Sequence, residues 1–146
     1  MFKHLLIPTD GSPLSEGAAL KSIQFARTLG ARVTAVHVSP RFHVLTYRTD
    51  MLEDTRAQYE KDSQLHADRY LAFITKAAAE SGVACESVRR VSDEIHQSII
   101  DVAREKGCDA IAMASHGRSG IAGLLIGSQT QRVLTHSALP VLVWRA

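Results

Sequence analysis

Short apolar runs alternate along this chain with longer segments in which apolar residues recur every three or four positions. The short runs predict buried β-strands and the longer segments predict amphipathic α-helices. We expect strands over residues 5–7, 33–38, 83–91, 110–114 and 139–144. We expect two helices over residues 14–29 and 50–81. A third helix should begin after residues 92–93 and end at Gly107. A fourth should follow the glycine-rich loop that comes after the fourth strand and run to about residue 137. This order predicts one doubly wound α/β domain, residues 1–146, with a parallel sheet between helices on both faces.

Turn and cap residues mark the ends of several predicted elements. Gly30 follows the first helix, where a left-handed residue commonly closes the last turn. Ser92 and Asp93 precede the third helix and can cap its first N–H groups. Pro140 lacks an N–H at the start of the last strand, which predicts an edge position for that strand.

Composition narrows the classes of partner. The 146 residues are enough for one domain with a real core, and the net charge is only +2. Because the basic pair at 89–90 has no interleaved aromatic residues, we expect no nucleic-acid partner. No apolar run approaches the ~20 residues that span a bilayer, so we expect no membrane association and a cytoplasmic location. Cys85 and Cys108 are far apart, and we expect two small buried side chains.

A glycine-rich segment, residues 114–129, stands between the fourth predicted strand and the last helix. In α/β folds, backbone N–H groups converge in such a loop and the helix dipole favours an anion. Gly117 and Gly127 allow close backbone approach, and Ser128 and Gln129 lie at the helix N-terminus. The segment therefore predicts a phosphate site.

Two other loops are expected at the same edge of the sheet. Doubly wound sheets bind ligands at the carboxyl ends of their strands where the winding reverses, which places the loop after the first strand beside the glycine-rich loop. There Thr9 and Asp10 could meet ribose hydroxyls, and Val38 could supply an apolar wall for a base. The alternative is that the glycines only let the loop turn and that Asp10 caps a helix.

The sequence lacks other nucleotide and catalytic motifs. It contains no G-x-x-x-x-G-K-[ST], which excludes a P-loop NTPase, and its first loop lacks G-x-G-x-x-G. His37, His66 and His136 have no metal-ligand spacing, so we expect core or surface roles for them and assign no protein metal ligand. His116 borders the glycine-rich loop, where it either touches a phosphate or braces the loop. No arrangement of a nucleophile with a base can be argued, and no catalytic residue is assigned.

These residues resemble the universal stress protein family. Its nucleotide-binding members carry G-x-x-G, nine residues and then G-[ST]. Here A-S-H-G at 114–117 is followed by nine residues and then by Gly127 and Ser128. The similarity extends over the whole chain, through residues 6–12, 36–38, 107–109 and 140–143.

The resemblance implies a sheet of order 3-2-1-4-5 and a homodimer paired through the last strand, residues 139–144. It also implies binding of ATP, ADP or AMP, with Mg²⁺ or Mn²⁺ held through the nucleotide phosphates. When the family's binding positions are transferred to this sequence, the resemblance implies that the loop after the first strand and the end of the second strand line the adenosine. It implies that the glycine-rich loop lines the phosphates. The candidate nucleotide-binding residues are Pro8, Thr9, Asp10, Val38, Met113, Ala114, His116, Gly117, Arg118, Gly127, Ser128 and Gln129.

Ala114 departs from the family pattern, which has glycine at this position. If the position needs a positive φ, alanine costs about 1 kcal/mol or more. If the position is extended, the methyl group only narrows the site. Because Met113 and Ala114 continue the strand pattern, we expect the extended case and a reduced affinity for nucleotide.

Three functions are compatible with the sequence. The first is a dimeric sensor or switch in stress response that binds an adenine nucleotide. The second is a nucleotide-free interaction module that uses the long second helix and the edge strand. The third is a slow ATPase, for which only Asp10, His116 and Arg118 are close candidates and the loop has no lysine, so we expect weak hydrolysis at most.

Overall fold

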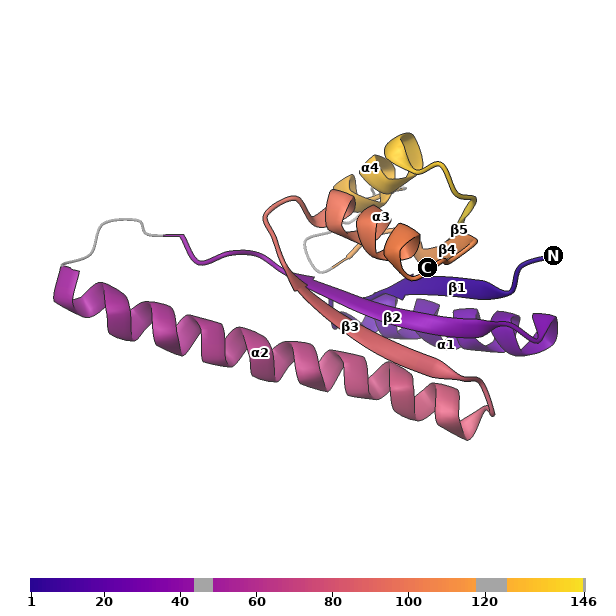
Figure 1. Cartoon of the computed structure of the whole chain (residues 1–146), viewed down its shortest axis with the longest axis horizontal. Coiled ribbons are helices and arrows are strands. Elements are labelled where there is room, and N and C mark those ends of the chain that lie inside the picture. Colours follow the sequence, from indigo (N-terminus) through magenta and orange to yellow (C-terminus); the bar gives the residue numbers. More distant parts are fainter. Residues whose placement is uncertain (44–48, 118–125, 146) are drawn as a thin grey trace.

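The computed structural model describes residues 1–43, 49–117 and 126–145, in which strands and helices alternate (Figure 1). The elements are β1 (His4–Pro8), α1 (Pro13–Leu29), β2 (Arg32–Ser39), α2 (Thr49–Glu80), β3 (Cys85–Val91), α3 (Ile95–Glu105), β4 (Ala110–Ala114), α4 (Ser128–His136) and β5 (Val141–Trp144). The strands form one parallel sheet of order β3-β2-β1-β4-β5. The predicted α/β class and the implied strand order are both confirmed.

Helices cover both faces of the sheet (Figure 1). From β1 the chain adds β2 and β3 on one side, then returns to add β4 and β5 on the other. Because parallel crossovers are right-handed, this reversal places α1 and α2 on one face and α3 and α4 on the opposite face. The reversal lies between β1 and β4.

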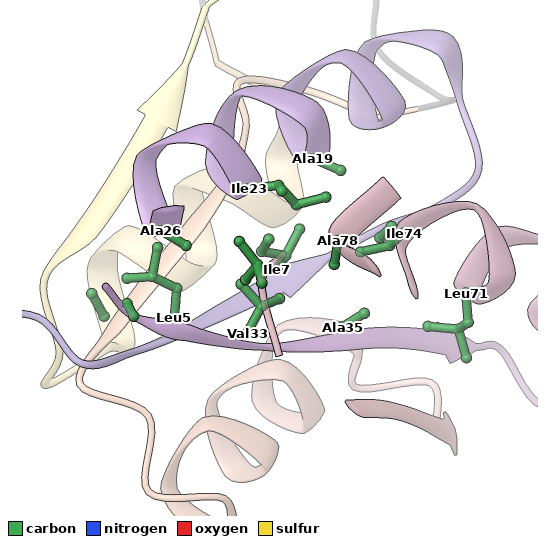
Figure 2. Packing of buried hydrophobic residues seen from close by; sticks show 13 residues of the cluster. Leu5, Ile7, Ala19, Ile23, Ala26, Val33, Ala35, Leu71, Ile74 and Ala78 are labelled. Carbon is green, nitrogen blue, oxygen red and sulfur yellow. The ribbon is translucent and has the colours of Figure 1, made fainter. Parts of the chain in front are cut away.

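The core on the α1–α2 face combines alternate strand residues with two helix stripes. Leu5 and Ile7 of β1 and Val33 and Ala35 of β2 point to this face, since successive strand residues point to opposite sides. Figure 2 shows these side chains against both helices, which contribute Ala19, Ile23, Ala26, Leu71, Ile74 and Ala78. The small alanines let the helices approach the strands closely.

The core on the α3–α4 face uses the other set of strand residues. Leu6 of β1, Val36 of β2 and Ile111 of β4 pack with Val102 of α3 and Val133 of α4. All five side chains are fully buried. The central strand β1 is therefore buried on both faces, which explains its continuous apolar run.

Both ends of α1 carry local signals. Ser12 is the N-cap, and its Oγ accepts a hydrogen bond from the Ser15 N–H at 3.2 Å. Gly30 closes the helix with φ +64°, and its N–H donates to the carbonyl of Arg27 at 3.2 Å. The predicted glycine cap is confirmed.

Two strands begin later than the sequence indicates. The Val83 N–H donates to the Ala78 carbonyl at 2.8 Å and closes the end of α2, so β3 begins at Cys85 and not at residue 83. β5 begins at Val141 and not at residue 139, because Leu139 makes a local turn with Ser137. β5 is at the sheet edge, as Pro140 predicts.

The predicted cap of α3 is wrong. The N-cap is Glu94, and it makes no side-chain cap hydrogen bond. Ser92 Oγ accepts from the Glu94 N–H instead, at 3.0 Å. Asp93 accepts from the Arg41 N–H at 3.0 Å and contacts His43 at the same distance, so it stabilises the segment after β2.

Among the residues of the long helix α2 whose side chains the structure describes, the buried ones lie in its second half: Ala67, Leu71, Ile74 and Ala78. Its N-terminal part extends beyond the strands (Figure 1). Within the described ranges, no helix is both long and apolar enough to cross a membrane.

Both cysteines are free thiols. Cys108 is buried and Cys85 is half-buried, in line with the expected packing role. Burial raises the pKa of the Cys108 thiol to about 11, and burial also raises the pKa of Cys85. Because the thiolate is the reactive form, neither side chain is suited to nucleophilic chemistry near neutral pH.

A buried polar chain crosses the sheet at the end opposite to the carboxyl ends of its strands. Thr34 donates its hydroxyl to Glu86 at 3.2 Å, so its oxygen accepts from His4 Nε2 at 2.7 Å. The other ring nitrogen of His4, Nδ1, is buried with no hydrogen-bond partner among the described residues. Burial of the ring lowers the pKa of His4 and so favours its neutral form.

Stability should fall as the solution is acidified below neutral pH. Burial is the main cause that lowers the pKa of His4 below its ordinary value of 6.5, and the same cause lowers the pKa of His37. The unfolded chain therefore binds more protons than the folded chain as pH falls through about 6.5, which favours unfolding. A series of melting temperatures between pH 8 and pH 5 checks this, and His4→Gln should flatten the decline. An equally steep decline in that variant contradicts the assignment to His4.

Candidate functional site

A cavity of about 790 Å³ opens at the carboxyl ends of β1, β2 and β4. Because the winding reverses between β1 and β4, this is the edge at which doubly wound folds bind ligands. The candidate residues that the structure brings together in its lining are Pro8, Thr9, Asp10, Val38, Met113, Ala114, His116, Gly117, Gly127, Ser128 and Gln129. Arg118, the remaining candidate, lies outside the described residues.

Gly127 stands where the backbone of His116 leaves no room for a side chain, and Gly117 stands against the movable carboxylate of Asp10. A Cβ on Gly127 would lie 2.7 Å from the Cβ of His116 and 2.9 Å from its Cα. A Cβ on Gly117 would collide with the carboxylate of Asp10. The Gly127 N–H also donates to the Ser115 carbonyl at 2.7 Å, so the two ends of the glycine-rich loop are held together.

The N-terminus of α4 opens toward this cavity. Its N-cap, Gly127, is extended (φ −72°, ψ 164°) and provides no side-chain acceptor for the first N–H groups. Ser128 and Gln129 form the first turn and line the cavity. Thr130 donates its hydroxyl to the Ala114 carbonyl at 2.9 Å, which fixes the helix to the end of β4. The first N–H groups of a helix have no partner within the helix, and together with the helix dipole they favour an anion here.

Thr9 organises the loop after β1 through bonds inside the protein. Its N–H donates to the Val36 carbonyl at 2.9 Å, and its hydroxyl accepts from the Gly11 N–H at 3.1 Å. The same hydroxyl lies 3.1 Å from Ser15 Oγ. The hydroxyl of Thr9 is thus already engaged, whereas the sequence suggested that it could meet a ribose.

Asp10 is the acidic side chain among the described lining residues. Its Oδ1 accepts from the Ser12 N–H at 2.9 Å, and Ser12 rather than Asp10 caps α1. Its other carboxylate oxygen faces Gly117 across the strand ends. The helix-cap alternative for Asp10 is therefore wrong, and the carboxylate lies between the two loops.

His37 and Tyr70 support the first loop from the α2 side. His37 Nδ1 donates to the Thr9 carbonyl at 2.7 Å, since a carbonyl only accepts, and this leaves Nε2 without the proton in the neutral ring. The His37 and Tyr70 rings meet edge to face with centroids 5.2 Å apart. Gly11 has φ +78°, and a Cβ there would overlap the ring of Tyr70. His37 is buried and holds the first loop through Nδ1, in line with the core role expected for it.

His116 lies next to Gly127, at the other end of the glycine-rich loop. Its Nδ1 lies 3.1 Å from Ser115 Oγ, and its backbone packs against Gly127. The side chain is half-buried and lines the cavity. This hydrogen bond joins His116 only to its neighbour Ser115, so both the bracing role and a phosphate contact stay predictions.

The profile of the Universal stress protein family matches residues 1–145 of this chain. The chain belongs to the universal stress protein family. Universal stress protein YxiE of Bacillus subtilis is 28% identical over 153 residues, which cover 99% of this chain and 100% of the relative. The solved structure of MJ0577 from Methanocaldococcus jannaschii is 28% identical, with a TM-score of 0.83 over 100% of this chain and 97% of that chain.

Two further universal stress protein structures share the fold. One, in complex with cAMP, is 22% identical, with a TM-score of 0.68 over 98% of this chain and 97% of that chain. The other, from Archaeoglobus fulgidus in complex with dAMP, is 19% identical, with the same TM-score and coverage.

In this universal stress protein, Ala114 is the last residue of β4 and lies opposite Trp144 of β5. No described non-glycine residue has a positive φ. The extended case that the strand pattern favoured is therefore confirmed, and the alanine carries no left-handed strain. Ala114 is one of the residues that line the cavity.

Sequence reasoning missed the contribution of α2 to this universal stress protein's cavity. Tyr59, Ser63, His66 and Tyr70 line it, together with Ser39 of β2. Their spacing of four, three and four positions places the helix residues on one face. That spacing was visible in the sequence, but an apolar stripe on a helix normally indicates core packing.

Proposed function

We propose that this universal stress protein binds an adenine nucleotide in the cavity at the carboxyl ends of β1, β2 and β4. The observation that carries the proposal is the N-terminus of α4, which has no side-chain cap and begins at Gly127, where the backbone of His116 leaves no room for a side chain. The cAMP and dAMP complexes of two relatives support the choice of an adenine nucleotide.

The base is proposed to lie on the α3 side of the cavity. Val38 and Met113 line that side together with Ile95 and Ile99 of α3, and they give an apolar surface for the face of an adenine ring. The phosphates would then reach Gly117, Gly127 and the first turn of α4. The ribose would lie between them, next to Asp10.

A divalent ion, Mg²⁺ or Mn²⁺, is proposed to bind through the nucleotide phosphates. Oxygen ligands suit both ions, and Asp10 is the carboxylate among the described lining residues. The ion would offset phosphate charge. The described lining contains no lysine or arginine that could stabilise a transferring phosphoryl group, which favours binding over turnover.

Thermal stability in the presence of ligand tests the proposed function. A ligand at 100 times its Kd adds about 2.7 kcal/mol to the free energy of unfolding. We expect ATP, ADP or AMP at millimolar concentration to raise the melting temperature, with GTP as the matched control. No shift with any adenine nucleotide would favour a nucleotide-free interaction module.

The Ala114→Gly variant should bind adenine nucleotide more tightly, by up to about tenfold, because it removes the methyl group that narrows the site. The same change should lower stability by roughly 0.5–1 kcal/mol, since glycine weakens a strand interior. Titration calorimetry with ATP and thermal unfolding measure the two effects. An unchanged or weaker affinity would show that the methyl group does not limit binding.

We further propose that the protein is a cytoplasmic homodimer that acts as a sensor or switch in stress response, with β5 as the contact. β5 is an edge strand whose four residues are all half-buried, and an unpaired apolar edge favours pairing with another strand. The edge is held firmly, because Trp144 Nε1 donates to Ser22 Oγ of α1 at 2.9 Å.

Sedimentation equilibrium at micromolar concentration should give about twice the 15.9 kDa mass of one chain. A monomer at this concentration contradicts the proposed pairing. Addition of ATP to the same sample shows whether nucleotide changes the association, as a switch requires.

A further inference from the structure

The cavity extends over both faces of the sheet. Val36 and Val38 of β2 belong to the core on the α3–α4 face. His37 and Ser39 alternate with them and therefore point to the α1–α2 face. Both sets line the same cavity, which passes around the end of β2. The proposed base position uses only the α3 side, so a second region is left under α2.

We call this region the α2-side half of the cavity; it is formed by His37, Ser39, Tyr59, Ser63, His66 and Tyr70. The rings of His37 and His66 both contact the ring of Tyr70. The His66 and Tyr70 rings are stacked with centroids 6.0 Å apart, and His37 meets Tyr70 edge to face. Tyr59 donates its hydroxyl to the Pro40 carbonyl at 2.9 Å, which fixes the outer end. The aromatic surface is thus assembled by the protein's own contacts.

Ser39 is the observation that points to a ligand. Its side chain is only 3% exposed, and Oγ has no hydrogen-bond partner among the described residues. A buried hydroxyl without a partner destabilises the folded protein, because it has lost its hydrogen bonds to water. Because Ser39 lines the cavity, a ligand atom can supply the missing hydrogen bond. His37 Nε2 is a second acceptor, since Nδ1 carries the ring proton.

The chemistry of this half favours an uncharged aromatic ring with hydrogen-bonding groups. The six side chains include no carboxylate, lysine or arginine. Aromatic rings that offer stacking, beside hydroxyl and imidazole groups that donate and accept, are the combination with which proteins hold unpaired nucleobases.

We propose that the α2-side half is a second subsite that holds a nucleobase attached through the ribose of the bound nucleotide. The ligand class is an adenine nucleotide extended at its 3′ oxygen by a second nucleoside. The inference rests on the proposed function, which places the ribose beside Asp10. Asp10 is followed by Gly11, and a Cβ on Gly11 would overlap the ring of Tyr70, so a ribose beside Asp10 would lie close to this half.

Titration calorimetry with two matched probes tests the subsite. The probes are AMP and pApA, which is AMP extended at its 3′ oxygen by adenosine monophosphate. We expect pApA to bind roughly tenfold tighter than AMP, because a stacked base commonly contributes that much. Ser39→Ala should weaken the binding of pApA about threefold, because it removes one neutral hydrogen bond, and the affinity for AMP should not change.

Ser63→Trp fills the α2-side half and should abolish the advantage of pApA over AMP. Gln64→Trp places the same bulk on the exposed face of α2 and should keep the advantage. Equal affinities of AMP and pApA for the unmodified protein overturn the inference and leave the proposed function intact. Failure of both probes to bind overturns the proposed function itself.

A third titration tests whether the second nucleoside has to be covalently attached to the bound nucleotide. Adenosine is titrated into protein that is already saturated with AMP, and no further binding is expected. Binding of free adenosine that Ser63→Trp removes would assign the subsite to a separate nucleoside and would overturn the 3′-extended ligand.

Discussion

The Gly127→Ala variant should fold, and it should bind adenine nucleotide about tenfold more weakly than the unmodified protein. The added Cβ would lie within 3 Å of both Cα and Cβ of His116, so the backbone of one of the two segments has to move. That movement separates the glycine-rich loop from the first turn of α4. Hydrogen bonds from N–H groups to a charged phosphate contribute about 1.5–3 kcal/mol each, so loss of one accounts for a tenfold effect.

Equilibrium dialysis with ATP measures this loss, and Gly17→Ala is the matched control. Gly17 lies in α1, has open space where a Cβ would be, and is not part of the cavity lining. The control should retain nucleotide and gain about 0.5–1 kcal/mol of stability, because alanine favours a helix interior. Equal ATP retention by Gly127→Ala and the unmodified chain would contradict the phosphate position.

The Leu6→Ala variant should be destabilised by roughly 2–5 kcal/mol. Leu6 is fully buried in the central strand β1 and packs with the core on the α3–α4 face. Its truncation leaves a void between strands and helices that have little freedom to close it. At about 2–4 °C per kcal/mol for a chain of this size, the melting temperature should fall by roughly 10 °C.

Leu20→Ala removes the same atoms from α1, where the side chain is 45% exposed. Its effect should stay within about 0.5 kcal/mol, as for most surface positions. Chemical denaturation of both variants compares the two free energies of unfolding directly. A similar loss for both would show that β1 is not the buried centre of the sheet.

The fold could be predicted from the sequence because the strands that define it are buried on both faces. Leu5, Leu6 and Ile7 serve both cores, so their apolar run is continuous and its position is unambiguous. Gly30 likewise marks a helix end with a left-handed residue that few other side chains adopt. These signals are local, and each is read within a few residues.

The parts of the site that could not be predicted depend on contacts between distant segments. Nothing near Gly11 in the sequence shows that Tyr70 covers it. The hydroxyl of Thr9 is engaged by Ser15, one turn into α1, rather than being left for a ligand. Asp93 has the right residue type for a helix cap, yet it bonds with Arg41 and His43 from the segment after β2.

Ala114 shows how a sequence departure acquires meaning from its conformation. In isolation, alanine in place of a motif glycine suggests backbone strain. In the sheet the residue is extended and opposite Trp144, so only its methyl group distinguishes it from glycine. The departure therefore carries no backbone strain, and its effect on nucleotide affinity stays a prediction that Ala114→Gly tests.

The most direct test of the account is equilibrium dialysis of the unmodified protein against millimolar ATP, with Gly127→Ala in a parallel cell. The account predicts that about one ATP per chain is retained by the unmodified protein and clearly less by the variant. Absence of retention by the unmodified protein at this concentration would contradict the central claim that the cavity binds an adenine nucleotide.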